Sequence, residues 1–450
     1  MAVNVKRCEN IVAQDDEVVG AACRVPYYPL VVKSGRGAII EDADGNEYID
    51  MLSSAAATNV GHSHPKVVDA IIEQAKEVIH YTPVYTYHEP LVKLAKELTE
   101  ITPGNFKKKV VFGLTGSDSN DGMIKLARAY TGRSKIISFI GAYHGSTYGS
   151  ISLSAISLNM RRKIGPLVPD IYHINYPHCY RCKFGKKEES CNLECLQDFE
   201  DKFKSYLPPE EVAAVIMEPI QGDAGLIVPP QKYVKKLYDL CKKNEILFAV
   251  DEVQQGFGRT GKWFGVENFG IEPDIIVMGK SIASGMPMSA IVARAEIMDA
   301  VGPPAHTFTT MANPICCKAA LATINVIKEE KLLEHSKNLG EYTKERFNKM
   351  KDKYSLIGDI RGIGLNIGVD LVKDRDTKER AQEAAAKICY RCWENGVLLT
   401  FFANNVLRVQ PPLVITKEQI DKALDIIETS IVEYLRGDIP DEVLKVAKGW

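Results

Sequence analysis

The chain has 450 residues, of which 45% are hydrophobic and 25% charged, a composition that suits a globular protein with two domains or one large domain and a smaller one. Lys and Arg total 56 against 58 Asp and Glu, which argues against a nucleic-acid partner, because such a partner calls for a clustered basic face. The first residues lack the apolar run of a signal peptide, and no apolar run reaches the roughly 18 residues of a membrane helix. We therefore expect no membrane association and a cytoplasmic protein whose eleven cysteines are mostly reduced thiols or metal ligands.

The first 60 residues predict an entry arm followed by a small sheet. Apolar and polar residues alternate over residues 37–51 around Asp44-Gly45-Asn46, a sequence typical of a hairpin turn. His64-Pro65 then opens a predicted helix that runs from Lys66 to Ile79.

From about residue 90 onward, helical stretches alternate with short apolar runs rich in β-branched residues. The runs are 108–113, 135–141, 212–219, 246–253, 274–280 and 289–294. Short buried strands separated by helices predict a mostly parallel sheet with helices on both faces.

The pattern changes after a helix expected over about 315–345. Strands are predicted within 357–372, 396–401 and 405–416, and a last helix from Lys417 to Leu435. These elements indicate a second, smaller α+β unit. The expected organisation is an N-terminal segment (1–60) that joins the small domain, a large cofactor-binding domain (61–325) and a C-terminal small domain (326–450).

Two charged residues stand where buried strands end, and ligands of open parallel sheets bind just beyond that edge. Lys280 follows the run IIVMG, where a partly buried ammonium is costly without a partner or a function. Desolvation lowers the pKa of a lysine, which suits a Schiff-base amine. Asp251 ends a neighbouring strand, where a carboxylate suits a pyridinium nitrogen. From position alone, a solvent-reaching lysine and a helix-capping aspartate remain alternatives.

A turn of small residues at 113–120 joins a strand to a helix. Its backbone amides and the positive end of the helix dipole suit a phosphate, although many α/β proteins have such turns without binding one. Tyr143, in GAYHG, ends another strand and either stacks on a flat ring or belongs to the core.

Eight motifs spread along the chain belong together. They are DADGNEYID (42–50), VGHSHPKV (60–67), TGSDSND (115–121), GAYHG (141–145), EPIQGDAG (218–225), DEVQQGFGRTG (251–261), MGKSIASGMPMSA (278–290) and FTTMANP (308–314). With them the chain resembles the class III (omega) aminotransferase family of fold-type-I enzymes that use pyridoxal 5'-phosphate (PLP). The resemblance implies an α/β fold, with a mostly parallel, seven-stranded-type sheet in the large domain and a smaller α+β domain.

The resemblance also implies roles for single residues around PLP. Lys280 matches the Schiff-base lysine, Asp251 the carboxylate at the pyridine nitrogen, and Gln254 the partner of the cofactor's 3'-oxygen. Gly116 and Ser117 resemble the residues of the phosphate cup.

Two further matches concern the ring and the neighbouring subunit. Tyr143 resembles the aromatic residue that stacks on the cofactor ring. Thr309 resembles the threonine that reaches the phosphate from the neighbouring subunit, which implies a homo-oligomer, dimer or tetramer, with shared active sites.

One departure from the commonest family pattern bears on the reaction. Many members read EPIQGEGG, and in the 4-aminobutyrate and ornithine branches that glutamate pairs with an arginine at the position of Arg408. This chain has the shorter Asp223 there, as does the branch of isoleucine 2-epimerase and other amino-acid racemases. That branch also shares LARAYTGR (126–133), YHGSTYGS (143–150), SLNMRRKIGP (157–166), NVLRVQPPL (405–413) and the terminal Gly449-Trp450.

The resemblance therefore favours an amino-acid racemase or epimerase for apolar or broad-range substrates. Racemisation needs protons on both faces of one planar intermediate, and Lys280 and Asp223 are the expected pair of bases. Arg408 is expected to bind the substrate carboxylate as a two-pronged donor. The alternative is that Asp223 only helps to hold Gln221 or a loop. An aminotransferase is the alternative reaction, and a non-catalytic relative is disfavoured by the retained Lys280, Asp251 and Gln254.

A cysteine cluster stands outside the resemblance. Cys179 and Cys182 have the two-residue gap of a zinc half-site, and Cys191 and Cys195 supply a second pair after a short spacer. Structural zinc, disulfide bonds and inert thiols all remain open for these residues. Cys389 and Cys392, at helical spacing, are expected to serve packing, and Cys316 and Cys317 need no function.

Overall fold

The computed structural model describes residues 3–449 and divides into two compact units. The larger unit runs from Pro65 to Leu333, and the smaller unit combines the residues up to His64 with those from Glu334 onward. The boundaries predicted from the sequence lie between residues 60 and 61 and between residues 325 and 326. Trp450, part of the terminal motif, lies outside the described residues. Among the described residues, no helix has the length and apolar character to cross a membrane.

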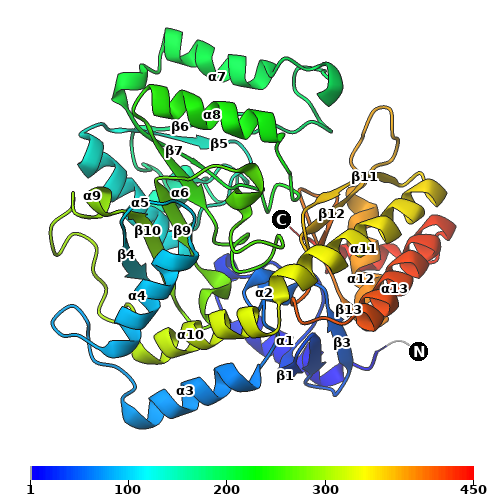
Figure 1. Cartoon of the computed structure of the whole chain (residues 1–450). Coiled ribbons are helices and arrows are strands. Elements are labelled where there is room, and N and C mark those ends of the chain that lie inside the picture. Colours follow the sequence, from blue (N-terminus) through cyan, green and yellow to red (C-terminus); the bar gives the residue numbers. More distant parts are fainter. Residues whose placement is uncertain (1–2, 450) are drawn as a thin grey trace. The chain divides into compact units, whose positions relative to one another are not determined.

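A seven-stranded sheet forms the centre of the larger unit, in the order β4-β10-β9-β8-β7-β5-β6 (Figure 1). Its strands are β4 (Lys108–Gly113), β5 (Lys135–Phe139), β6 (Ile171–Ile174), β7 (Val212–Met217), β8 (Leu247–Asp251), β9 (Ile275–Met278) and β10 (Ser289–Arg294). All six predicted runs form strands, and the predicted fold class is confirmed. β10 is antiparallel to both β4 and β9, whereas β9, β8, β7, β5 and β6 are parallel to one another. An apolar run alone does not encode the direction of its strand.

Helices cover both faces of this sheet. They are α3 (Pro65–Glu77), α4 (Glu89–Ile101), α5 (Gly116–Thr131), α6 (Tyr148–Leu153), α7 (Glu194–Ser205), α8 (Gln231–Lys243), α9 (Ala295–Met298) and α10 (Pro314–Glu329). The apolar side of α5, including Met123, packs in one core cluster with Ala249 of β8. The adjacent Phe248 points to the opposite face, where its ring meets Tyr238 of α8 edge-on at 5.5 Å. Figure 1 shows α7 beside α8.

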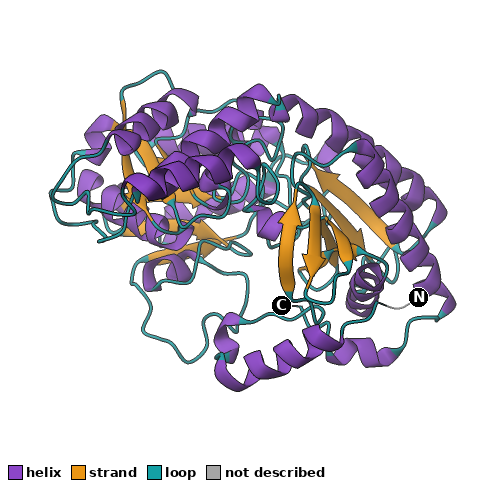
Figure 2. Cartoon of the chain, turned by 90° about the horizontal axis from the view of Figure 1, so that it is seen from below, coloured by secondary structure: helices purple, strands orange, loops and turns teal. Residues whose placement is uncertain are grey.

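The smaller unit contains two four-stranded sheets, β1-β2-β3-β13 and β11-β12-β15-β14. Their strands are β1 (Val32–Arg36), β2 (Ile39–Asp42), β3 (Glu47–Asp50), β11 (Ile357–Gly362), β12 (Ile367–Leu371), β13 (Val397–Leu398), β14 (Thr400–Phe402) and β15 (Val406–Val409). The predicted hairpin is β2–β3, and Gly45 takes φ +89° in its turn. The strand expected over 396–401 divides between the two sheets, because β13 pairs with β3 and β14 with β15. Figure 2 shows the strands of each unit grouped together, with helices outside them.

The helices outside the larger unit are α1 (Lys6–Val18), α2 (Ser53–Ala56), α12 (Gln382–Glu394) and α13 (Lys417–Arg436), and α11 (Leu332–Lys353) runs across the boundary between the units. The expectation of one helix over 315–345 is wrong. The chain breaks between α10 and α11, where Lys331 has φ +51°, a conformation that a right-handed helix cannot contain.

Candidate active site

The carboxyl ends of the parallel strands bring the predicted site residues to one edge of the large sheet. Asp251 is the last residue of β8, Glu218 directly follows β7, and Lys280 lies two residues beyond β9. Tyr143 lies four residues beyond the end of β5. Because these strands run parallel, their ends meet at the same edge, which is where open α/β sheets bind ligands.

The carboxylate of Asp251 is buried and held by two side chains. Its Oδ2 accepts a hydrogen bond from Asn120 Nδ2 at 2.9 Å and lies 2.7 Å from His144 Nδ1, while Oδ1 accepts from the backbone amide of Val253 at 3.0 Å. A buried carboxyl that is held in a fixed orientation at a strand end is the kind of group that a pyridinium nitrogen needs as its partner.

Glycine residues let three segments of this edge approach closely. A Cβ on Gly279 would lie 3.3 Å from the backbone nitrogen of Gly116, and a Cβ on Gly116 would lie 2.8 Å from the side chain of Val253. Lys280, next to Gly279, takes φ +47°, a strained conformation for a residue with a side chain. The lysine, the small-residue turn and the loop after Asp251 are therefore adjacent, as a single ligand that contacts all three requires.

The turn at 113–120 opens α5 with a capping box. The side chain of Thr115 accepts from the amide of Asp118, and the carboxylate of Asp118 accepts from the amide of Thr115. Since the box engages those two amides, the first-turn amides that a phosphate would meet are those of Gly116 and Ser117. The Ser117 hydroxyl accepts from the amide of Ser146 at 3.1 Å.

Glu218 ties two loops of the site together. Its Oε1 accepts from the amide of Tyr143 at 3.1 Å and its Oε2 from the amide of Gly222 at 2.7 Å. Burial, and next the charge of Asp251, raise the pKa of this carboxyl well above its usual range. Burial also raises the pKa of the Tyr143 phenol, which keeps that ring neutral. The side chain of Glu218 thus fixes the backbone beside Tyr143 and the turn that carries Asp223.

Asp223 lies buried at the tip of a tight turn, in which the amide of Gly225 donates to the carbonyl of Gly222 at 3.0 Å. Its Oδ1 accepts from Gln254 Nε2 at 3.1 Å. The approach needs a glycine at 222, because a Cβ there would lie 2.3 Å from the amide oxygen of Gln254. Gln254, expected beside the 3'-oxygen of the cofactor, therefore also contacts the carboxylate expected to act as a base.

Two predicted residues do not stand at the strand ends described above. Thr309 is exposed in the loop before α10, and its carbonyl oxygen is 3.0 Å from His80 Nε2. Arg408 belongs to the smaller unit, on β15, where it is buried with its guanidinium 4.5 Å from the ring centre of Phe402 and its Nε donating to Gln410.

The cysteines are all free thiols, so the structure does not contain the disulfides considered for Cys179, Cys182, Cys191 and Cys195. Cys389 and Cys392 are fully buried on α12, as expected for packing residues.

Sequence reasoning gave no role to three residues that organise the site, Asn120, His144 and Glu218. All three stand inside the quoted motifs, within TGSDSND, GAYHG and EPIQGDAG. The sequence shows that all three residues are polar. It does not show their partners, because Asn120 and His144 both contact Asp251, which lies more than a hundred residues away in the chain.

Residues 21–431 match the class-III aminotransferase family, and the chain belongs to that family. It is 47% identical over 447 residues to isoleucine 2-epimerase of Lentilactobacillus buchneri, with 99% of each chain covered. It is 48% identical to leucine/methionine racemase of Thermococcus litoralis, covering 99% of this chain and 100% of that one. A probable 4-aminobutyrate aminotransferase of Bacillus subtilis is 37% identical, covering 89% and 92%.

Solved structures agree with the fold. A Bacillus anthracis aminotransferase superposes with a TM-score of 0.88 at 31% identity, covering 96% of this chain and 100% of that one. A PLP-bound amine transaminase from an uncultivated Pseudomonas species superposes with a TM-score of 0.85 at 28% identity, covering 92% and 98%. The family and this neighbour indicate PLP as the cofactor. Three features of the site fit PLP, namely the buried Asp251 carboxyl, the close backbone approach at Gly116 and Gly279, and the N-terminus of α5.

Proposed function

We propose that the protein is a PLP-dependent amino-acid racemase or 2-epimerase that inverts the α-carbon of apolar or broad-range amino acids. The observation that carries the proposal is the buried Asp223 at the strand edge that also holds Lys280 and Asp251. The greater identity to an epimerase and a racemase than to the 4-aminobutyrate aminotransferase supports it. The names of these two relatives, for isoleucine and for leucine or methionine, support an apolar substrate.

The chemistry of the side chains suggests a role for each of them in the reaction. PLP, when bound, withdraws electrons from the substrate α-carbon and acidifies its proton. The Asp251 carboxylate, fixed by Asn120 and His144, holds a proton on the pyridine nitrogen. The Lys280 amine exchanges the α-proton on one face, and the Asp223 carboxyl exchanges it on the other.

Binding of the cofactor and of the substrate is assigned to other groups. Gly116 and Ser117 would hold the cofactor phosphate through the first turn of α5, and Tyr143 would cover the cofactor ring. Arg408 binds the substrate carboxylate as a two-pronged donor. Removal of the proton on one face and its return on the other inverts the α-carbon without a second substrate.

The second candidate is an aminotransferase, which the family match itself favours. In that reaction Lys280 would carry out the proton transfers on one face alone, so Asp223 would not be needed as an acid. The two candidates therefore differ in whether a single-enantiomer substrate is inverted in the absence of a 2-oxo acid.

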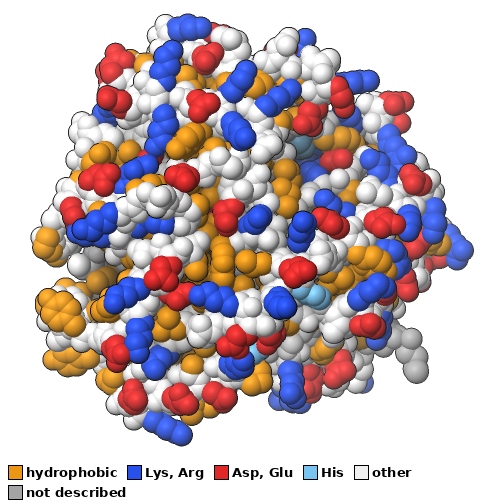
Figure 3. Space-filling view, viewed as in Figure 1, with side chains coloured by type: hydrophobic (Ala, Val, Ile, Leu, Met, Phe, Trp, Pro, Cys, Tyr) orange, Lys and Arg blue, Asp and Glu red, His pale blue; other side chains and the backbone are white. Residues whose placement is uncertain are grey.

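We further propose that the active enzyme is a homodimer or homotetramer with shared sites. The connection between α3 and α4 exposes large hydrophobic side chains, Val78, Ile79, Tyr81, Tyr85 and Tyr87, and Tyr87 is 96% exposed. Figure 3 shows hydrophobic atoms at the edge of the molecule where this connection runs. His80 and His88, in the same stretch, contact the carbonyls of Thr309 and Ala312, each at 3.0 Å. The exposed Thr309 thus lies on a surface that suits a second copy of the chain.

One experiment distinguishes the two reactions. Single-enantiomer leucine, isoleucine or methionine is incubated with the holoenzyme in deuterated water, with and without a 2-oxo acid. Chiral chromatography and mass spectrometry then follow inversion, deuterium incorporation and transamination. Inversion with deuterium in the product, independent of the 2-oxo acid, is expected. Rapid transamination without inversion would reject the racemase.

A further inference from the structure

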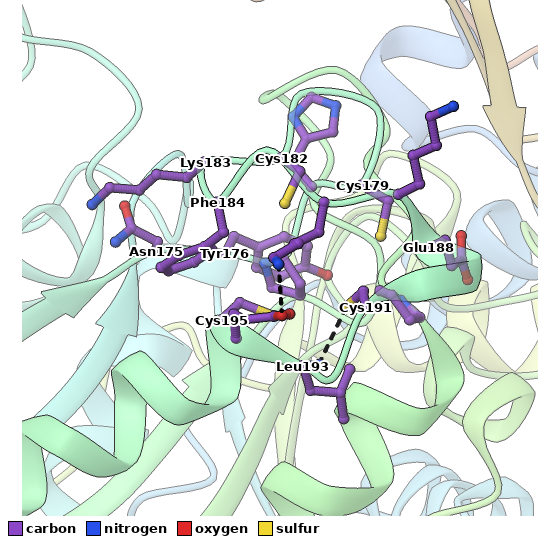
Figure 4. Close-up of a pocket in the computed structure, with 16 residues that line it drawn as sticks. Asn175, Tyr176, Cys179, Cys182, Lys183, Phe184, Glu188, Cys191, Leu193 and Cys195 are labelled. Atoms are coloured by element: carbon purple, nitrogen blue, oxygen red, sulfur yellow. Dashed lines mark hydrogen bonds and ion pairs between the residues drawn. The ribbon is translucent and has the colours of Figure 1, made fainter.

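The connection between β6 and α7 carries four cysteines that the proposed reaction does not use. Cys179 and Cys182 stand on one loop, and Cys191 and Cys195 on the segment that leads into α7. All four are partly buried and line one pocket, and Figure 4 shows their sulfur atoms around a common opening. The cavity that these residues line has a volume of about 30 Å³, which is enough for one small ion or one water molecule.

Backbone groups already point at two of the sulfurs. The amide of Leu193 donates to Cys191 Sγ at 3.2 Å, drawn as a dashed line in Figure 4. Cys195 is the second residue of α7, so its sulfur lies in the positive field of a twelve-residue helix. Backbone N–H groups that surround cysteine sulfurs stabilise the thiolate, which is the form that binds metal ions.

We propose that Cys179, Cys182, Cys191 and Cys195 bind one structural Zn²⁺ ion in a tetrahedral four-thiolate site. Binding displaces up to four thiol protons to solvent, so affinity rises with pH. Zinc–sulfur bonds of about 2.3 Å place the sulfurs of such a site about 3.8 Å apart. Among the described residues, the group of three or more histidine, cysteine or carboxylate ligands whose ligand atoms lie within 4.8 Å of one another is Cys8, Asp42 and Asp44. The four pocket sulfurs do not lie that close together, so binding of the ion would require their side chains to move toward one another.

The group formed by Cys8, Asp42 and Asp44 is a weaker candidate for a metal site than the four pocket cysteines. Asp42 accepts hydrogen bonds from Tyr48 and Asn46, and Asp44 accepts from the amides of Arg7 and Cys8. These carboxylates already serve as the acceptors of a turn.

The position of this connection indicates what the ion would stabilise. Tyr176, which lies in the connection just before the cysteines, is buried and donates its hydroxyl to the carbonyl of Glu218 at 2.9 Å. The loop that Glu218 opens carries Asp223 and its turn. Zinc would hold the connection together without touching the reacting atoms, because four protein thiolates leave no open coordination position for a substrate.

Metal analysis of the full-length holoenzyme tests the proposal. Protein purified with a phosphine reductant, stripped with a chelator and reconstituted with Zn²⁺ should retain about one zinc per chain after gel filtration. Cys182→Ser combined with Cys191→Ser should reduce this below about 0.2 per chain, whereas Cys23→Ser, which changes an exposed cysteine outside the pocket, should not. Zinc retained by the double variant, or lost by the Cys23 variant, would overturn the assignment.

A spectroscopic measurement on the wild type covers the case in which the double variant does not fold. Co²⁺ in a four-thiolate site gives intense bands in the red, away from the yellow band of PLP, and these bands should saturate at one equivalent. Thiol titration of the unreduced, metal-free protein in denaturant should find all eleven cysteines free. No cobalt bands in reduced protein, or four oxidised cysteines in protein from a reducing compartment such as the cytoplasm, would reject the zinc site.

Discussion

The amide of Gln254 donates to Oδ1 of Asp223 at 3.1 Å, and both side chains are buried. This bond fixes the orientation of the carboxyl, because Gln254 itself follows the Asp251 strand end. An asparagine at 223 retains one oxygen for this bond, so the substitution removes the acid without removing its anchor.

Asp223→Asn should lower inversion of either enantiomer by about 10²–10⁴, the usual contribution of a positioned acid or base. Lys280 remains, so α-proton exchange should survive, with retained configuration, for the one enantiomer whose proton faces the lysine. Deuterium incorporation read by mass spectrometry measures this. Asp239→Asn, on the exposed side of α8, is the matched control. Unchanged racemisation by the Asp223 variant would reject the two-base reaction.

Lys280→Ala should abolish the covalent link to PLP. Borohydride should bleach the yellow wild type and fix one label per chain on the peptide that contains Lys280, whereas the variant should retain no label and nearly no turnover. Lys236→Ala, at an exposed position of α8, should behave as wild type. Peptide mapping that finds the label on another lysine would overturn the assignment.

Thr309→Ala should weaken PLP retention, because a hydroxyl contact to the phosphate would be lost across the subunit boundary. The adjacent exposed Thr310→Ala should have little effect. Mixed dimers of Thr309→Ala and Lys280→Ala subunits should recover activity, since one of the two shared sites then has both wild-type residues. Verified mixed dimers without recovered activity would show that the phosphate site is not shared.

The stability of the larger unit should depend on pH through His173 of β6. Burial, with the charge of Arg161, lowers its pKa to about 4, while its Nε2 contacts the carbonyl of Leu153 at 3.1 Å. The unfolded chain binds the proton from about pH 6.5 downward, so the contribution to stability is complete above that pH and is lost as the pH falls towards 4. The melting temperature should fall more for wild type than for His173→Gln between about pH 7.5 and pH 5. Equal falls would contradict the prediction.

The sequence alone determined the class of fold, and its resemblance to the family supplied the expected roles of Lys280 and Asp251. β4 and β10 have the predicted bounds because short apolar runs between helices have few other stable arrangements. The residues expected to bind the cofactor stand in the short motifs that carry the family resemblance, and motifs of neighbouring residues can be recognised in a sequence without knowledge of the fold.

Only the tertiary structure decided which distant residues meet. It reversed the direction of β10, divided 397–402 between two sheets and broke the helix near Lys331. It also placed Asn120 and His144 on Asp251, and Gln254 on Asp223. Strand direction and buried hydrogen bonds depend on partners far away in the chain, and the free energy that selects those partners arises only when the chain is packed.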